Sequence, residues 1–102
     1  MSKYSRGAAF ERRVKLSYQL RGWYVMRSAG SKGLCDLIAF KGGEVHLLQL
    51  KVSGKMTPLE RCQLYELARE NKFQAILVTR DNKKNLYRLL FEAIDVSTKE
   101  GE

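Results

Sequence analysis

The chain has 102 residues, enough for one compact domain. We expect that domain to span residues 1–96 and to be followed by a frayed tail over residues 97–102. Its 19 Lys and Arg against 11 Asp and Glu give a net charge of +8, which favours a polyanionic partner such as nucleic acid. No apolar stretch is long enough for a signal peptide or a membrane span, so we expect an intracellular, cytoplasmic protein. Two cysteines and one histidine exclude a disulfide framework, a Cys/His zinc site and a histidine-based triad.

Hydrophobic periodicity, turn residues and caps predict seven elements in the order αβββαββ. Taken along the chain, they are a helix over 5–21, strands over 23–28, 34–41 and 44–52, a helix over 58–71, and strands over 73–80 and 86–91. Thr57 and Glu60 form a capping box around Pro58, which marks the start of the second helix. Because hairpins come first, we expect a central sheet of mixed strand direction with helices on it, an α/β fold.

A Gly-Gly pair at positions 42–43 joins the second and third predicted strands. Such a pair favours a two-residue hairpin turn, because both turn positions need positive φ. The tight turn fixes a register in which Asp36 faces Gln49, with Cβ atoms about 5 Å apart. Side chains alternate along a strand, so Lys51 projects to the same side as Gln49, and Cys35 is expected to face away from Asp36.

An acid, an amide and an amine therefore converge on one patch of apolar strands. We expect these groups to be buried, and burial costs several kcal/mol unless the charges are paired or bind a metal. The Asp36 carboxylate, the Gln49 amide oxygen and the Leu50 carbonyl suit a hard divalent cation such as Mg²⁺, for which Mn²⁺ can substitute. Such a cation polarises a phosphate and lowers the pKa of a bound water, while Lys51 neutralises the growing charge. The combination predicts phosphodiester hydrolysis.

Asp36 followed by Gln49-Leu50-Lys51 also resembles the PD-(D/E)xK nuclease motif. The preceding stretch is more specific, and it comprises Arg6-Gly7, Glu11-Arg12, Gly22, the run RSAGSK over residues 27–32, and Asp36-Leu37. Together these residues resemble the archaeal-type Holliday junction resolvases over about residues 4–53, while the C-terminal half matches only in its pattern of helix and strands. The resemblance implies a restriction-endonuclease-like fold and a homodimer that nicks symmetric strands of a four-way DNA junction. It fits an archaeal, bacterial or viral origin.

The resemblance also implies roles by position. Glu11 would organise metal and water, Arg27 and Ser31 would contact the DNA backbone near the cleaved bond, Asp36 would be the principal metal ligand and Lys51 the amine of the site. The expected catalytic group is Glu11, Ser31, Asp36, Gln49 and Lys51, and the expected metal ligands are Asp36, Gln49, Leu50 and Glu11.

Basic side chains concentrate in the first half of the chain, around this site. We expect them to follow DNA phosphates, so that binding falls steeply with salt and reads DNA shape instead of sequence. The expected DNA-binding residues are Arg6, Arg12, Arg13, Arg27, Ser31, Lys32 and Lys55.

Gln49 departs from the family pattern, which has an acid at this position. The amide still offers a carbonyl oxygen, but the site loses one negative charge. Three accounts remain open: a natural variant that still cleaves, a natural binder without activity, or an acid changed to an amide to trap an uncut complex. Apart from these accounts, three functions are open: a Mg²⁺-dependent Holliday junction resolvase, a non-catalytic branched-DNA-binding module, or a related nuclease acting on ends, flaps or damaged DNA.

Overall fold

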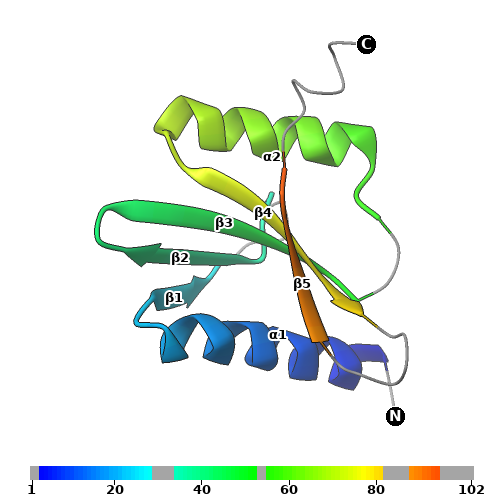
Figure 1. Ribbon diagram of the computed structural model, residues 1–102. Coiled ribbons are helices and arrows are strands. Elements are labelled where there is room, and N and C mark those ends of the chain that lie inside the picture. The colour runs from blue at the N-terminus through cyan, green and yellow to red at the C-terminus, as the bar shows by residue number, and fades with distance from the viewer. Residues whose placement is uncertain (1–2, 29–33, 53–54, 82–87, 95–102) are drawn as a thin grey trace.

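In the computed structural model, which describes residues 3–28, 34–52, 55–81 and 88–94, two helices pack on opposite faces of one mixed sheet (Figure 1). The elements are α1 (Lys3–Leu20), β1 (Tyr24–Arg27), β2 (Leu37–Lys41), β3 (Glu44–Lys51), α2 (Pro58–Asn71), β4 (Gln74–Asp81) and β5 (Arg88–Ala93). The predicted order αβββαββ is confirmed. The tail predicted over residues 97–102 lies outside the described residues.

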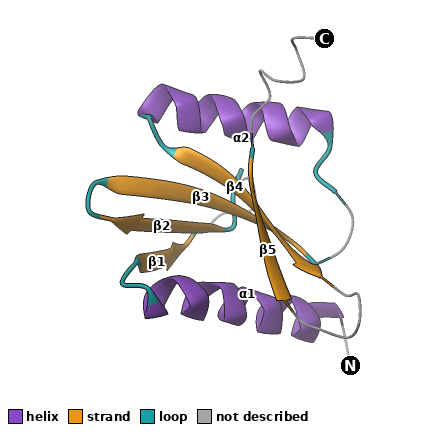
Figure 2. Cartoon of the chain, in the orientation of Figure 1, coloured by secondary structure: helices purple, strands orange, loops and turns teal. Residues whose placement is uncertain are grey.

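The sheet has the strand order β1-β2-β3-β4-β5. Its neighbouring strands are antiparallel except for β3 and β4, which run parallel. A parallel pair needs a crossover connection, and α2 provides it on one face of the sheet (Figure 2). The mixed strand directions predicted from the sequence are therefore confirmed, and the crossover brings the start of α2 close to the end of β3.

The Gly-Gly turn between β2 and β3 has the conformation that the sequence predicts. Gly42 has φ +55° and Gly43 has φ +89°. Cα partners run from Lys41 opposite Glu44 to Leu37 opposite Leu48, which confirms the predicted register. However, β2 begins at Leu37, three residues later than predicted, so the ladder ends just before the positions of Asp36 and Gln49.

Two apolar clusters hold the helices on the sheet. Under α1, Phe10, Val14 and Tyr18 pack against β-strand residues that include Leu48, and all four are buried. Under α2, buried Leu64 and Ala68 pack against a second set, which includes Leu47, Ala75 and Leu77. Because Leu47 faces α2 and strand side chains alternate, Gln49 and Lys51 also face α2.

Strand alternation predicts Cys35 on the face of the sheet opposite to Gln49, but Cys35 lies on the same face as Gln49. It is buried in the cluster under α2, whereas His46 contacts Tyr18 on the α1 side. The expectation assumed that strand alternation extends back to Cys35. Alternation applies only from Leu37 onward, because the residues before it are not part of the strand.

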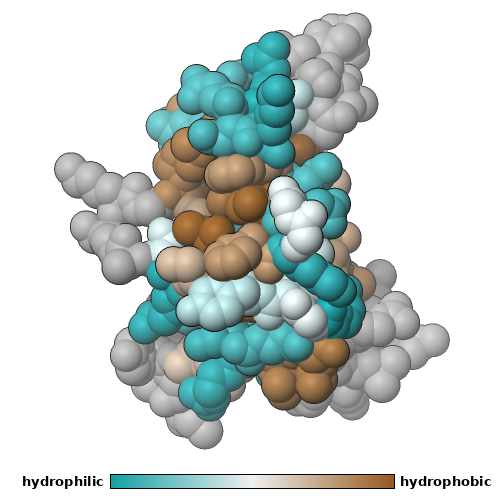
Figure 3. Space-filling view, turned by 90° about the vertical axis from the view of Figure 1, so that its left-hand side faces the viewer, coloured by the Kyte–Doolittle hydropathy of each residue, from teal (hydrophilic) through white to brown (hydrophobic). Residues whose placement is uncertain are grey.

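Seen from the side of the β2–β3 turn, apolar surface lies between hydrophilic surfaces above and below it (Figure 3). Exposed apolar side chains on the first two strands include Tyr24 and Phe40, whose ring centroids are 5.0 Å apart. No helix in the described part of the chain is long and apolar enough to cross a membrane.

Candidate functional site

Asp36 joins three segments at the point where the β2–β3 ladder ends. Its Oδ2 accepts a hydrogen bond of 2.8 Å from the backbone N–H of Leu50. Its own N–H donates to the carbonyl of Leu48 at 2.7 Å, and its carbonyl accepts from the N–H of Ser28 at 2.9 Å. The last pair of the β2–β3 ladder is Leu37 with Leu48. The Asp36 carboxylate, in place of a β2 carbonyl, therefore accepts the hydrogen bond from the Leu50 N–H. This places it against the backbone between Gln49 and Lys51.

The expectation that these groups are buried is wrong. Asp36 is exposed, Gln49 and Lys51 are half-buried, and no polar or charged side chain within the described ranges is buried. The reason is the late start of β2 at Leu37, which leaves Asp36 outside the covered part of the sheet. A desolvation cost therefore cannot argue for a bound metal here, but the carboxylate is accessible to a large substrate.

Gln49 and Lys51 meet α2 at its first turn. The Nζ atom of Lys51 lies 3.8 Å from Oε2 of Glu60. Leu34, Gln49, Glu60 and Gln63 line a small surface hollow of about 170 Å³. The hollow therefore collects an amide from the strand together with a carboxylate and a second amide from the helix.

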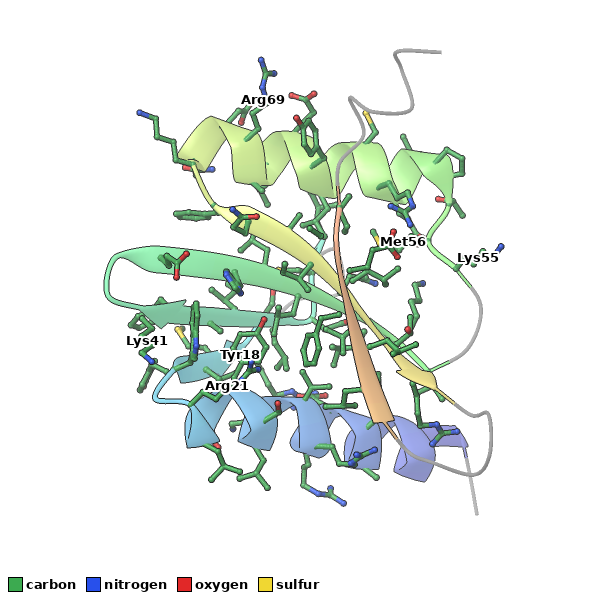
Figure 4. All side chains as sticks on the ribbon, viewed as in Figure 1. Tyr18, Arg21, Lys41, Lys55, Met56 and Arg69 are labelled. Atoms are coloured by element: carbon green, nitrogen blue, oxygen red, sulfur yellow. The ribbon has the colours of Figure 1, made fainter. Side chains whose placement is uncertain are left out.

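Glu60 is held in place by the cap of α2. Its Oε1 accepts from the backbone N–H of Thr57 at 2.8 Å, and its own N–H donates to Thr57 Oγ1 at 3.1 Å. The pKa of Glu60 is lowered chiefly by the hydrogen bond from the Thr57 backbone, and the charge of Lys51 lowers it further. The segment before the helix is anchored by Met56, which points inward under α2, while Lys55 points away from the fold (Figure 4).

The sequence identified Glu60 as a capping residue and missed its position beside Lys51. A signal was present, because the second helix begins soon after the Gln49–Lys51 strand and Glu60 lies in its first turn. A helix that crosses back over a sheet starts near the end of the strand it follows. The neighbours of its first turn could not be identified without the three-dimensional path of the crossover.

Glu11 lies on α1 and pairs with Arg27 on β1, with Oε2 and Nε 2.7 Å apart. The Glu11 side chain is 23% exposed and that of Arg27 is 74% exposed, so the arginine remains accessible. Among the residues that the structure describes, no three His, Cys, Asp or Glu side chains are grouped so that they could hold a metal ion. No third side chain of these types is therefore grouped with Glu11 and Asp36 in the described residues, and the role of Glu11 as a metal ligand stays a prediction.

The expected DNA-binding residues are spread over several elements. Arg12 and Arg13 are exposed on α1, along an open depression that Lys15 also lines. Lys55 is exposed just before α2, at the end of the molecule where Lys51 meets the helix. Three expected contributors lie outside the described part of the structure: Ser31, Lys32 and the side chain of Arg6.

We call the group of Asp36, Gln49 and Leu50, at the end of the β2–β3 ladder, the Asp36 edge. Its ligand atoms are of the type that a hard divalent cation binds. Asp36, Gln49 and the main chain of Leu50 each offer a carboxylate or carbonyl oxygen, the type of ligand that Mg²⁺ and Mn²⁺ prefer. One carboxylate oxygen of Asp36 is used by the Leu50 N–H, which leaves the other free of that bond. Strand residues alone thus supply a single negative charge to such a site.

Comparison with solved structures first defines the class of fold. The chain superimposes on Hjc of Archaeoglobus fulgidus, described as a Holliday junction resolvase from an archaeal hyperthermophile, with a TM-score of 0.71 at 20% identity. The match covers 87% of this chain and 73% of that one, so the two share the mixed α/β fold.

Sequence comparison then gives the family. The family model for archaeal Holliday junction resolvases (Hjc) matches residues 2–101, and the chain belongs to this family. A curated relative, the crossover junction endodeoxyribonuclease Hjc of Methanocaldococcus jannaschii, is 49% identical over 53 residues. That alignment covers 52% of this chain and 39% of the relative, so it spans less than half of the relative's length. The resemblance found in the sequence motifs is confirmed.

Proposed function

We propose that this protein is a structure-selective endonuclease that resolves four-way DNA junctions by metal-dependent hydrolysis of phosphodiester bonds. Membership of the archaeal Holliday junction resolvase family supports this function. The observation that carries it is the bond from the Leu50 N–H to the Asp36 carboxylate, with Gln49 and Lys51 on either side of Leu50. This bond holds an exposed carboxylate against the backbone of the strand segment that carries an amide and an ammonium side chain.

The proposed division of roles follows from the chemistry of each group. Asp36, the amide oxygen of Gln49 and the carbonyl of Leu50 would hold Mg²⁺. The chemistry that such a cation supplies when bound is polarisation of the phosphate and a lower pKa for a water molecule. Lys51 would stabilise the negative charge that develops on the phosphate oxygens, or hold the attacking water by a hydrogen bond. In the proposed complex, Glu11 would assist from α1, with Arg27 and Ser31 against the DNA backbone.

DNA recognition in this proposal is electrostatic and follows the shape of the junction. The net charge of +8 would attract the DNA. Phosphates would be contacted by the exposed Arg12, Arg13 and Lys55, together with Arg6 and Lys32. A homodimer would present two such sites to one junction and cut two strands symmetrically. Analytical ultracentrifugation of the free protein and of its junction complex tests the dimer, and one copy per junction would contradict it.

The function is tested with a labelled synthetic four-way junction, comparing the chain as it stands with Asp36→Asn and Gln49→Glu. Asparagine keeps an oxygen that can accept from the Leu50 N–H, but it removes the charge. We expect Asp36→Asn to lose at least about a hundredfold in cleavage rate, the lower end of what a positioned catalytic group contributes. We expect Gln49→Glu to cleave faster, because it adds a negative charge for the cation. Junction binding in EDTA should persist in all three proteins.

The second candidate function is a junction-binding module without activity, and Gln49 is the observation that favours it. If neither the original chain nor Gln49→Glu cuts branched or linear DNA in Mg²⁺ or Mn²⁺, the endonuclease proposal fails and the binding function remains. If free ends, flaps or damaged duplexes are cut faster than junctions, the chemistry stands but the substrate is a different one.

A further inference from the structure

The Asp36 edge has an amide, Gln49, at the place where a second acid would give it another negative charge. A carboxylate does lie beside that amide, but it comes from the helix. Glu60 lines the same 170 Å³ hollow as Gln49, although the two residues belong to different elements of the fold. A carboxylate from α2 therefore lines the same hollow as the amide of Gln49.

Glu60 also lies next to the amine of the site. Its Oε2 is 3.8 Å from the Nζ of Lys51, and Lys51 is two residues from Gln49 on the same face of β3. Asp36 bonds to Leu50, the residue between them. In the segment from Gln49 to Lys51, the Asp36 carboxylate thus contacts the backbone and the Glu60 carboxylate lies beside the Lys51 side chain.

The position of Glu60 is fixed without using up its carboxylate. One oxygen, Oε1, accepts the N–H of Thr57, while Oε2 is turned toward Lys51. A carboxylate has about four lone-pair positions, so it can serve a helix cap and a further partner together. The Glu60 side chain is 43% exposed, which leaves it accessible from solution.

We propose that Glu60 supplies the acidic group that Gln49 lacks, so that Asp36 and Glu60 are the two carboxylate ligands of the divalent cation. This inference rests on the proposed function for the location of the cation site. In this proposal Gln49 is a neutral oxygen ligand, and the first turn of α2 is part of the site. The competing account is that Glu60 only caps α2 and pairs with Lys51.

Two substitutions separate these accounts, because glutamine preserves the cap. A capping box accepts Gln as well as Glu at its fourth position, so Glu60→Gln removes the charge while keeping the helix start. The exchange variant Gln49→Glu/Glu60→Gln moves the charge back to the strand with the same number of acids. Glu66→Gln is the matched control, since Glu66 is exposed on the same helix and pairs with Arg69. Circular dichroism and thermal melting confirm that each variant is folded.

The primary measurement is the binding of Mn²⁺ alone to DNA-free protein, followed by electron paramagnetic resonance of the free ion. We expect Glu60→Gln to weaken Mn²⁺ binding by about tenfold or more, since charge count tunes the affinity of such sites. We expect the exchange variant to return to within about threefold of the original chain, and Glu66→Gln not to differ from it. A chain that binds no Mn²⁺, a Glu60→Gln variant that binds like the original, or an exchange variant that is not restored would each overturn the inference.

Junction cleavage by the same proteins distinguishes failure of the inference from failure of the function. If the original chain cuts junctions and Glu60→Gln cuts them equally well, the function stands and Glu60 is only a cap. If no variant cuts any DNA but Mn²⁺ binding follows the expected pattern, the inference stands on a scaffold without the proposed activity.

Discussion

The guanidinium of Arg27 and the carboxylate of Glu11 form an ion pair of 2.7 Å that ties β1 to α1. The pair is asymmetric, because the arginine is largely exposed and the glutamate is not. Exposed pairs of this kind contribute about 1 kcal/mol or less to stability, so the pair is a weak structural element. Its larger effect is on charge, since Glu11 offsets the positive charge of an arginine expected to contact DNA.

Replacing Glu11 by Gln tests this balance. We expect the variant to bind a four-way junction a few times more tightly in EDTA, because a negative charge near the phosphates is lost, while its unfolding free energy changes by less than about 1 kcal/mol. Fluorescence anisotropy and urea denaturation measure the two quantities, with Glu70→Gln on α2 as a control. If Glu11 also assists catalysis, as the family resemblance implies, cleavage in Mg²⁺ falls even though binding improves. Unchanged binding in EDTA would contradict the charge argument.

Lys55 and Arg69 provide a second comparison, because both are exposed cations at opposite ends of α2 (Figure 4). We expect Lys55→Ala to reduce the slope of log affinity against log salt by about one, the change expected for the loss of one phosphate contact. Arg69→Ala, which removes an equal charge far from the site, should leave that slope unchanged. Junction titrations across a range of salt concentrations measure both. Equal slopes for the two variants would mean that net charge, and not position, determines binding.

His46 gives the fold a dependence on pH. Its Nδ1 is hydrogen-bonded to Tyr18 Oη at 3.0 Å, and burial lowers the pKa of His46 below its ordinary value of 6.5, with Glu44 raising it and Arg21 lowering it to smaller extents. The unfolded chain therefore takes up a proton at a pH where the folded chain does not. Stability from this residue is complete above about pH 6.5 and is lost as the pH falls toward the folded pKa.

The comparison that isolates this effect is His46→Gln. Urea denaturation at about pH 8 and about pH 5.5 should show that the stability advantage of the original chain over the variant shrinks at the lower pH. Titrating carboxylates affect both proteins alike and cancel in the difference. A difference that stays constant across this range would show that His46 has the same pKa in both states.

The hairpin turn yields a prediction about backbone strain. Gly43 has φ +89°, and a Cβ built there meets nothing within 4 Å, so any cost of a side chain comes from the backbone alone. We expect Gly43→Ala to lower the unfolding free energy by about 1–2 kcal/mol, and Gly43→Asn to cost less, because asparagine tolerates positive φ better. Urea denaturation of the two variants provides the test. Equal losses would indicate a steric or solvation effect in place of strain.

Features set by neighbouring residues could be predicted from the sequence. The Gly-Gly pair permits one tight turn, which gave the β2–β3 register, and the capping box around Pro58 gave the start of α2 to the residue. Family motifs pointed to Asp36 and Lys51, which the structure brings to the same segment of β3.

Features that depend on long-range packing could not be predicted. The place where β2 begins is set by its neighbours in the sheet, and this decides that Asp36 is exposed and that Cys35 packs under α2. The position of Glu60 depends on how the crossover lays α2 on the sheet, which no local pattern in the sequence specifies.

The bond between Asp36 and the main chain of Leu50 makes the proposed cation site depend on the correct alignment of β2 with β3. A hairpin misaligned by a single residue would shift Leu37 along β3 and carry Asp36 away from Leu50, which would leave the Leu50 N–H without its acceptor. A molecule with that error would lose a hydrogen bond and a ligand together. The fraction of molecules in a preparation that binds a divalent ion should therefore equal the fraction with the correct strand register. A bulk measurement of secondary structure cannot distinguish the two registers.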